Sequence, residues 1–511
     1  MTAPDISDRA RSRSLFERET LMIAAFGALI GFGCVLRLWK LADAGLWYDE
    51  LWTVVGASDR PFMDMYQSWI LGDPHPPGYF LFYFAWFKLF PNDEFWARLP
   101  NAAAGVLTVL YLLFGARPVL SRDERVFASA LAAFSSLYLF YAVNVKQYSA
   151  MIFLGTVATI AYLEIVQERR LTRRTGIVFA AACVGLAYLN HFAMAYSWVL
   201  AGMLAVTFRR EPMVLRPLGR IASALAVAYL PIAYFLYFPH LYAETSQPGR
   251  LATLFSDLLP SLFFEDRAFV TGSLAVLGAG LAVPFLLGRQ ARFEAGSSRN
   301  RHVLWILVTF AGLLLLLGLT QPIFTVRYVL ILFPVALLGL AILTAAAFPI
   351  SRGWFAVLPL IFFARAAIVD FRAIDRMQRQ EWDESVDLVL SSDRPGDAIY
   401  VLGSNPEMTT LDFLRAGDVD GVVYLKNVKF YEYYFRRRGA EEIAARLEVV
   451  EPTVQAAGEL AQEYQHTGKT VYVLAGHHIQ FDDEALWVLG QAARDVETTW
   501  LYSTIVYEVT F

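Results

Sequence analysis

The stretch Leu46-Trp47-Tyr48-Asp49-Glu50, followed by Asp73-Pro74-His75-Pro76-Pro77, decides how this chain is interpreted. The acidic pair lies about ten residues beyond the first apolar run, which is long enough to cross a bilayer. Carboxylates close to hydrocarbon are costly and are usually kept for function. The first question is therefore which side of a membrane this loop faces.

The composition is that of a polytopic membrane protein. Of the 511 residues, 57% are hydrophobic and 18% are charged, whereas soluble domains are about 45–50% apolar. The net charge of −4 gives no sign of nucleic-acid binding. Cys34 and Cys183 lie inside apolar runs, so we expect no disulfide. The run 21–41 is too long for a signal-peptide core and is interpreted as a retained first helix.

The apolar runs predict about eleven transmembrane helices, each of which needs roughly 20 residues. The predicted spans are 20–41, 99–115, 126–142, 149–166, 176–190, 193–208, 219–238, 268–287, 303–320, 328–347 and 353–369.

The aromatic run 76–90 is the difficult segment, because it is short for a span and aromatic residues favour the interface. If it does not span, about twenty Lys and Arg residues fall in loops on one side, which the positive-inside rule makes cytoplasmic. We therefore interpret 76–90 as an interfacial or re-entrant helix. The N-terminus is then cytoplasmic, and the loops 42–98 and 239–267 face outward together with everything after about residue 370.

The segment 371–511 has a different character, with more charges and shorter apolar runs. We interpret residues 1–370 as the transmembrane domain and residues 371–511 as a small extracytoplasmic α/β domain. The predicted strands are 398–402, 421–425 and 470–474, and the predicted helices are 383–390, 408–415, 441–447 and 483–493.

Several motifs together resemble the GT-C membrane glycosyltransferases, in particular the protein mannosyltransferase and aminoarabinose transferase type (glycosyltransferase families 39 and 83). They are the outward acidic pair, HPPGYF at 75–80, FWARLP at 95–100, YAVNVKQY at 141–148, FTVRY at 324–328 and QEWDESVDLVLSSDRPGD at 380–397. The resemblance covers most of residues 15–405. One departure is Asn144-Val145-Lys146, where family members often have Glu-x-Arg.

The resemblance implies a GT-C fold in a bacterial inner membrane and an active site on the outer face. It also implies transfer of a sugar from a polyprenyl-phosphate-linked donor to a lipid, glycan or protein acceptor. Such a reaction needs a base for the acceptor hydroxyl, cations for the leaving phosphate and an apolar groove for the prenyl chain.

Asp49 is the predicted general base of an inverting displacement, because a carboxylate beside an apolar wall becomes more basic. The alternative is an interfacial Asp that caps a short helix. Glu50 is the second candidate, although neighbouring side chains point in different directions.

The candidates for binding the donor phosphate lie at predicted outer ends of spans, where snorkelling or aromatic-belt placement are the alternatives. Arg suits bidentate phosphate binding, and Lys acts as a point charge. The candidates are Lys146, Tyr148, Arg327, Tyr328, His75 and Arg98.

No cofactor is predicted with certainty. Asp73, His75 and His191 are possible ligands of a divalent metal, with Asp49 nearby, but their spacing alone shows no site.

Two other functions compete with this interpretation. An O-antigen ligase or polymerase would use a diphosphate-linked oligosaccharide, but that class places its main outward loop late in the chain. A lipid or sugar transporter usually has polar residues in the middle of its spans and inverted repeats, whereas here the polar residues gather at one face.

Overall fold

The fold was analysed in a computed structural model of the full chain. It describes residues 6–58, 60–71, 73, 75–236, 297–320, 330–350, 356–375, 382–392, 398–402, 419–476, 480–501 and 504–511. The predicted span 268–287, the predicted outward loop 239–267 and the predicted helix 408–415 lie outside the described residues.

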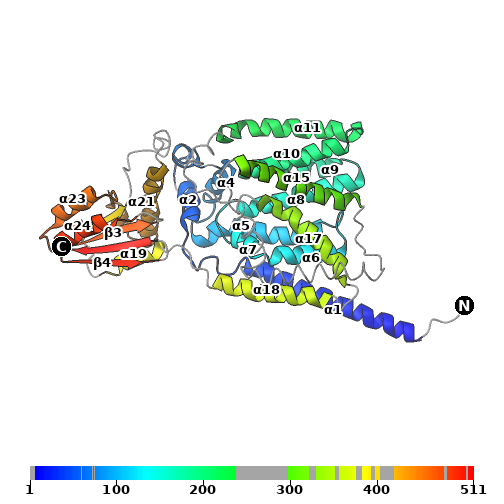
Figure 1. The fold of residues 1–511 in the computed structure, drawn as a ribbon, viewed down its shortest axis with the longest axis horizontal. Helices are drawn as coiled ribbons and strands as arrows, with labels where there is room; N and C mark the ends of the chain where they lie inside the picture. The colour runs from blue at the N-terminus through cyan, green and yellow to red at the C-terminus, as the bar shows by residue number, and fades with distance from the viewer. Residues whose placement is uncertain are drawn as a thin grey trace.

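Most of the described residues belong to a bundle of long apolar helices whose axes run in broadly the same direction (Figure 1). Five of the helices within the described ranges are long and apolar enough to cross a membrane, or six if one bent pair counts as a span. The bundle consists of α1 (Ile6–Leu36), α5 (Glu94–Leu110) with the π-helical turn η2 (Tyr111–Gly115), α6 (Arg122–Ala133), α7 (Ser136–Ala142), α8 (Tyr148–Glu168), α9 (Arg173–Leu189), α10 (His191–Thr207), α11 (Pro212–Tyr229) with η3 (Leu230–Leu236), α15 (Ser298–Thr320), η4 (Leu330–Leu332) with α17 (Phe333–Ala347), and α18 (Val357–Asp375).

Side-chain caps set where several of these helices begin. Asp93 accepts a hydrogen bond from Trp96 N at the start of α5, and Ser121 and Glu124 form a capping box at the start of α6. A single residue, Asn190, joins α9 to α10 and caps the second of them. Because such caps satisfy the first N–H groups of a helix, they define the residue at which each of these helices begins.

The predicted span 126–142 is broken into α6 and α7, which meet at 63°. The guanidinium of Arg37 donates to the carbonyls of Ala132 and Ala133 at the end of α6, over 2.6 and 2.8 Å. At the start of α7, Ser136 donates to the carboxylate of Asp370 over 2.6 Å. A cation at a helix C-terminus and an anion at a helix N-terminus are both favourable, so these two side chains stabilise the break.

Short helices fill the first loop between α1 and α5. They are α2 (Tyr48–Ala57), α3 (Phe62–Met65) with the π-helical turn η1 (Tyr66–Ile70), and α4 (Gly78–Trp86). The ambiguous segment 76–90 thus contains a helix of only 9 residues, whereas a hydrocarbon core requires roughly 20.

The C-terminal part is built on a mixed five-stranded sheet with the order β2-β1-β3-β5-β4. Its strands are β1 (Ala398–Leu402), β2 (Glu448–Val450), β3 (Thr470–Gly476), β4 (Asp495–Trp500) and β5 (Thr504–Thr510), and its helices are α19 (Trp382–Leu390), α21 (Val419–Arg437), α22 (Glu441–Ala444), α23 (Val454–Tyr464) and α24 (Asp483–Ala492). Strands β2, β1 and β3 pair in parallel, while β5 pairs antiparallel with β3 and β4.

The predicted strands 398–402 and 470–474 correspond to β1 and β3, and the helix prediction 483–493 matches α24. The predicted strand 421–425 is wrong, because these residues belong to the long helix α21. A short apolar run does not distinguish a strand from part of a buried helix.

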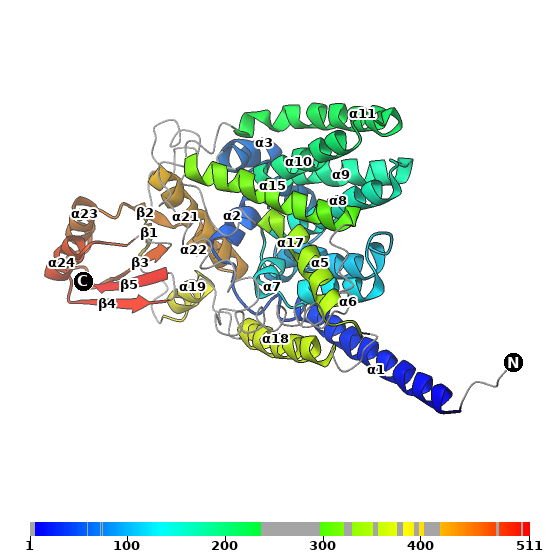
Figure 2. The ribbon, with the colours of Figure 1, turned by 45° about the vertical axis from the view of Figure 1, so that its right-hand side comes forward.

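Both views place the sheet at one end of the bundle, and the beginning of α1 lies at the other (Figures 1 and 2). Helices α2 and α21 lie between the bundle and the sheet, in contact with each other. The first loop, which carries the acidic pair, and the C-terminal sheet therefore share one end of the molecule.

Candidate active site

The acidic pair lies in the first turn of α2, where its two members have different surroundings. Glu50 is fully buried, whereas Asp49 is only half-buried. Glu50 also closes the start of its own helix, because its Oε2 accepts from the backbone N of Trp47 over 3.2 Å. The first turn thus points one carboxylate into the protein and leaves the other nearer to the surface.

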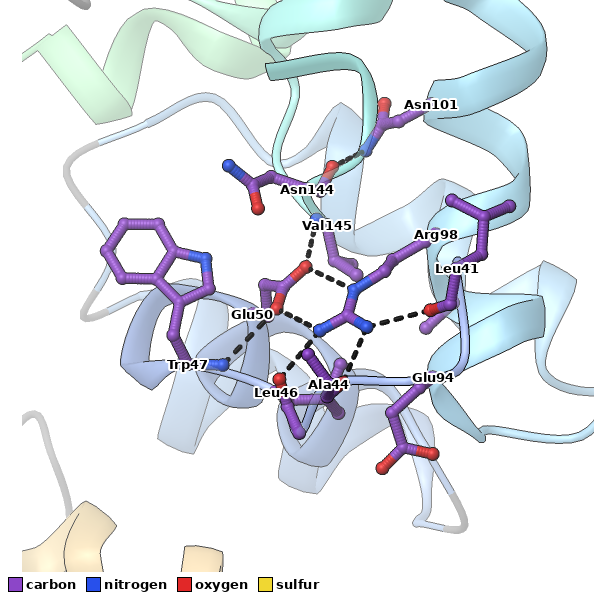
Figure 3. Close-up of polar contacts among 12 residues, drawn as sticks. Leu41, Ala44, Leu46, Trp47, Glu50, Glu94, Arg98, Asn101, Asn144 and Val145 are labelled. Atoms are coloured by element: carbon purple, nitrogen blue, oxygen red, sulfur yellow. Dashed lines mark hydrogen bonds and ion pairs between the residues drawn. The ribbon is translucent and has the colours of Figure 1, made fainter. Parts of the chain in front are cut away.

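Arg98, in the first turns of α5, binds Glu50 through two hydrogen bonds (Figure 3). Its Nε donates to Oε1 over 3.0 Å, and a terminal nitrogen donates to Oε2 over 2.8 Å. The remaining donors reach the carbonyls of Leu41, Ala44 and Gly45 at 2.7 to 2.8 Å. An arginine has five N–H donors, so this geometry leaves Arg98 none for a phosphate.

The carboxylate of Glu50 is similarly saturated. Besides Arg98 and Trp47 N, its Oε1 accepts from the backbone N of Val145 over 2.9 Å. Four donors on one carboxylate use about all of its lone-pair sites. Glu50 therefore joins three segments, the turn before α2, the start of α5 and the turn after α7, into one buried frame (Figure 3).

The turn after α7 is also fixed from a second direction. Asn101 of α5 donates through Nδ2 to the carbonyl of Asn144 over 2.6 Å and to the hydroxyl of Tyr79 over 2.8 Å. Ser149 of α8 donates in turn to the carbonyl of Asn101 over 2.8 Å. These bonds hold the backbone on both sides of Lys146, a buried lysine.

Asp73 and His75 form a contact in the first loop that the sequence motif alone could not establish. Asp73 Oδ1 accepts from the backbone N of His75 over 2.8 Å and from its Nδ1 over 2.7 Å. Burial of Asp73 raises the pKa of its carboxyl, but His75 and Lys146 outweigh burial and hold that pKa below its usual value. The structure thus brings Asp73, His75 and Lys146 into one electrostatic cluster, in which the carboxylate orients the imidazole ring.

Three further residues at this site were missed by the sequence analysis. The indole Nε1 of Trp47, the Nδ2 of Asn144 and the Nε2 of Gln147 are buried donors with no hydrogen-bond partner in the described part of the chain. Trp47 donates its backbone N–H to the Glu50 carboxylate, and Asn144 precedes Val145, which does the same. Buried donors without acceptors are rare in native proteins. Buried donors that lack an acceptor suit an anionic or oxygen-rich ligand.

The other predicted site residues are placed as follows. Tyr148 begins α8 and is buried against the ring of Tyr141, with the ring centroids 4.8 Å apart. His191 is the first residue of α10 and is partly buried. Arg327 and Tyr328 lie outside the described residues.

A metal site is not formed by the side chains that the structure describes, because no three His, Cys, Asp or Glu residues among them gather at one point. Asp73 and His75 contact each other, but a catalytic zinc site uses three protein ligands.

One family match covers the middle of this site. Residues 74–238, which include His75, Arg98 and Lys146, match the family described as dolichyl-phosphate-mannose-protein mannosyltransferase. Curated protein sequences yield no significant match.

The fold is similar to that of a solved bacterial protein over nearly its whole length. ArnT from Cupriavidus metallidurans bound to undecaprenyl phosphate superposes with a TM-score of 0.52 and 10% identity, covering 94% of this chain and 97% of ArnT. The apo structure of the same protein superposes with a TM-score of 0.54 and 12% identity, covering 95% of this chain and 98% of ArnT. The apo oligosaccharyltransferase from Archaeoglobus fulgidus has a TM-score of 0.46 and 13% identity, covering 89% of this chain and 69% of the oligosaccharyltransferase chain. The two ArnT structures confirm the GT-C fold that the motifs predicted.

Proposed function

We propose the function of this chain from one premise, which is that it has the GT-C fold of the ArnT and protein mannosyltransferase type. The chain is a membrane glycosyltransferase of the bacterial inner membrane. It transfers a sugar from a polyprenyl-phosphate-linked donor to an envelope acceptor, which is a lipid, a glycan or a protein. The undecaprenyl phosphate bound to the similar ArnT structure supports this class of donor.

One observation carries the proposal. The buried pair Glu50–Arg98 fixes both the helix turn that presents Asp49 and the turn that carries Lys146. A candidate base and a candidate phosphate-binding cation are therefore held on the same frame. Because correct relative placement of reacting groups supplies a large part of enzymatic rate enhancement, such a frame suits a group-transfer site.

The reaction that this arrangement supports is a direct displacement. The carboxylate of Asp49 takes the proton of the acceptor hydroxyl as its oxygen attacks the anomeric carbon. The bond from that carbon to the phosphate oxygen breaks, and its electron pair leaves with the polyprenyl phosphate. One displacement with one base inverts the anomeric centre, in contrast to the double displacement of retaining enzymes.

The leaving phosphate needs positive charge and hydrogen-bond donors. We assign this role to Lys146, to His75 oriented by Asp73, and to the N–H groups of Trp47 and Asn144. Buried donors aimed at developing negative charge stabilise it more strongly than water does. Tyr148, Arg327 and Tyr328 stay predicted members of the same site.

Glu50 and Arg98 receive a different role from the one that their sequence positions indicated. Each uses its hydrogen-bonding capacity on the other and on backbone groups. In the proposal they are the scaffold of the site, while proton removal and phosphate binding belong to their neighbours.

The membrane arrangement completes the proposal. About eleven spans cross the bilayer, the N-terminus is cytoplasmic, and the first loop and the domain 371–511 face the outside. This arrangement is supported by the first loop and the sheet, which lie at the same end of the molecule, opposite the beginning of α1 (Figure 1).

The test uses the purified protein and a panel of undecaprenyl-phosphate-linked sugars. Asp49→Asn should lower kcat by about 10²- to 10⁴-fold, as expected for loss of a general base. Asp43→Asn is the matched control, because the side chain of Asp43 forms an exposed ion pair with Lys40, three residues away, and no other ion pair among the described residues. Full activity of Asp49→Asn would remove the assigned base. If the protein transferred sugar only from diphosphate-linked donors, a ligase or polymerase function would replace the proposed one. If it transported lipid or sugar without transferring a sugar, a transporter function would replace it.

A further inference from the structure

Helix α21 of the C-terminal part contacts the loop that carries the acidic pair. The residues on its loop-facing side follow helical spacing, and they are Lys426, Phe430, Tyr433, Tyr434 and Arg437. Every one of them contacts the segment between α1 and α5 or the start of α5 itself.

Lys426 anchors one end of this contact. Its side chain is buried, and its Nζ donates to the carbonyl of Ser68 over 2.7 Å. The same Nζ lies 3.6 Å from the centroid of the Trp69 ring and 5.2 Å from that of Trp52. An amino group over aromatic faces is attracted by the rings, while burial lowers the pKa of this lysine. The lysine thus ties α21 to η1 and, through Trp52, to α2.

Tyr434 anchors the contact close to the acidic pair. Its hydroxyl accepts a hydrogen bond from the backbone N of Leu46 over 2.7 Å, and both residues are buried. One turn earlier, the ring of Phe430 packs edge-on against Tyr48, with centroids 5.3 Å apart. These contacts fix the residues immediately before Asp49.

The end of α21 reaches the beginning of α5. The hydroxyl of Tyr433 donates to the carbonyl of Asn92 over 2.8 Å, and Arg437 forms an ion pair with Glu94 at 3.0 Å. Because Arg98 follows Glu94 by one helical turn, α21 supports both partners of the buried scaffold.

The opposite side of α21 is attached to the sheet. Tyr431 donates through its hydroxyl to the carbonyl of Ala475 over 3.0 Å, and Asn427 donates to the carbonyl of Gly476 over 3.2 Å. Both acceptors are in β3. The helix is therefore fixed to a rigid element on one side and presents the loop-facing residues on the other.

We propose that Lys426 and Tyr434 of α21 are positioning residues for the carboxylate of Asp49. The frame of Glu50 and Arg98 holds α2 from the membrane side, and α21 holds it from the outer side. Only with both contacts does the first turn of α2 have one position relative to Lys146. The catalytic part of this inference rests on the proposed function.

Matched variants test the inference in the full-length protein. Tyr434→Phe removes the hydroxyl that contacts Leu46, and Tyr431→Phe removes a hydroxyl on the same helix that contacts β3 and Ser385 of α19, away from the loop. Lys426→Met removes the buried amino group, and Lys429→Met removes one that is 42% exposed and pairs with Glu432.

Transfer kinetics provide the first readout. We expect Tyr434→Phe and Lys426→Met to lower kcat by about three- to tenfold, the equivalent of one lost hydrogen bond or more. The donor KM should stay within about twofold, because neither residue contacts the donor phosphate. Tyr431→Phe and Lys429→Met should keep the kcat of the wild type. Equal kcat values for Tyr434→Phe and Tyr431→Phe would overturn the inference.

Hydrogen–deuterium exchange of residues 46–57 provides the second readout and requires no turnover. Faster exchange in Tyr434→Phe and Lys426→Met, but not in their controls, supports the inference even if no donor on the panel is used. Unchanged exchange in this segment would overturn it. Absence of transfer by the wild type would count against the proposed function alone.

Discussion

Arg98 and Glu50 face each other from helices that begin 46 residues apart, and they meet in a fully buried double hydrogen bond of 3.0 and 2.8 Å. Neither residue exposes a group that could exchange with solvent. An ion pair of this kind is costly to assemble and more costly to break on one side.

The first prediction concerns that pair. Glu50→Gln leaves the guanidinium of Arg98 buried without its counter-charge, and we expect a loss of about 3–5 kcal/mol in the free energy of unfolding. The measurement is thermal unfolding in detergent. Asp43→Asn, which breaks an exposed pair, should cost about 1 kcal/mol or less.

A double replacement completes the test of the pair. Glu50→Leu combined with Arg98→Met removes both charges and should recover part of the stability lost in Glu50→Gln. Wild-type stability in Glu50→Gln would contradict the scaffold role.

The second prediction concerns the pH dependence of Asp73. The folded protein holds the pKa of this carboxyl below its ordinary value of 3.8, despite burial, because of His75 and Lys146. The ionised form therefore contributes stability that is fully present above the ordinary pKa and is lost as the pH falls through the lowered one. Its hydrogen bonds should be worth about 2 kcal/mol.

The measurement is unfolding temperature against pH for the wild type and Asp73→Asn. The unfolding temperature of the wild type should exceed that of Asp73→Asn down to about pH 4, and the difference should close below that pH. A gap that widens in acid would show that the folded state raises the pKa of Asp73.

The third prediction concerns the unpartnered donors. Trp47→Phe and Gln147→Leu each remove a buried N–H group that makes no hydrogen bond within the described residues. Stability should stay the same or rise, because no internal bond is lost and a desolvated polar group disappears. The Kd for undecaprenyl phosphate should rise about three- to tenfold, which equals one hydrogen bond to the ligand.

Asn101→Leu is the contrasting variant, since the amide of Asn101 bonds to Tyr79 and to Asn144. It should lose stability and affinity together. Loss of stability in Trp47→Phe and Gln147→Leu with unchanged affinity would assign their donors to the fold instead of the ligand.

The sequence predicted the bundle well because hydropathy and charge act over whole helices. The spans around Tyr148–Glu168 and Phe333–Ala347 are long and apolar, so helices form there whatever the details of packing. Part of α21 was predicted as a strand, because the short apolar run 421–425 does not by itself distinguish a strand from a helix. The helical spacing of Lys426, Phe430, Tyr434 and Arg437 is a signal that identifies it.

The separate surroundings of Asp49 and Glu50 could not be predicted, because the partners that distinguish them are remote. Arg98 is 48 residues from Glu50 and Val145 is 95 residues from it. Adjacent carboxylates look alike in a sequence, and only the packed structure shows which one is saturated. The contact of Asp73 with His75 is local, but its link to Lys146 depends on how α7 and the first loop meet.

The contacts between α21 and the first loop also set an order of events during biosynthesis. Leu46 and Tyr434 are separated by 388 residues, which a ribosome needs roughly 20 to 80 s to translate. Throughout that interval the segment around Tyr48 and Trp69 lacks the helix that covers it. The loop that emerges first is thus among the last parts to be completed, and a nascent chain released before α21 emerges holds every residue of the acidic loop without the helix that covers it.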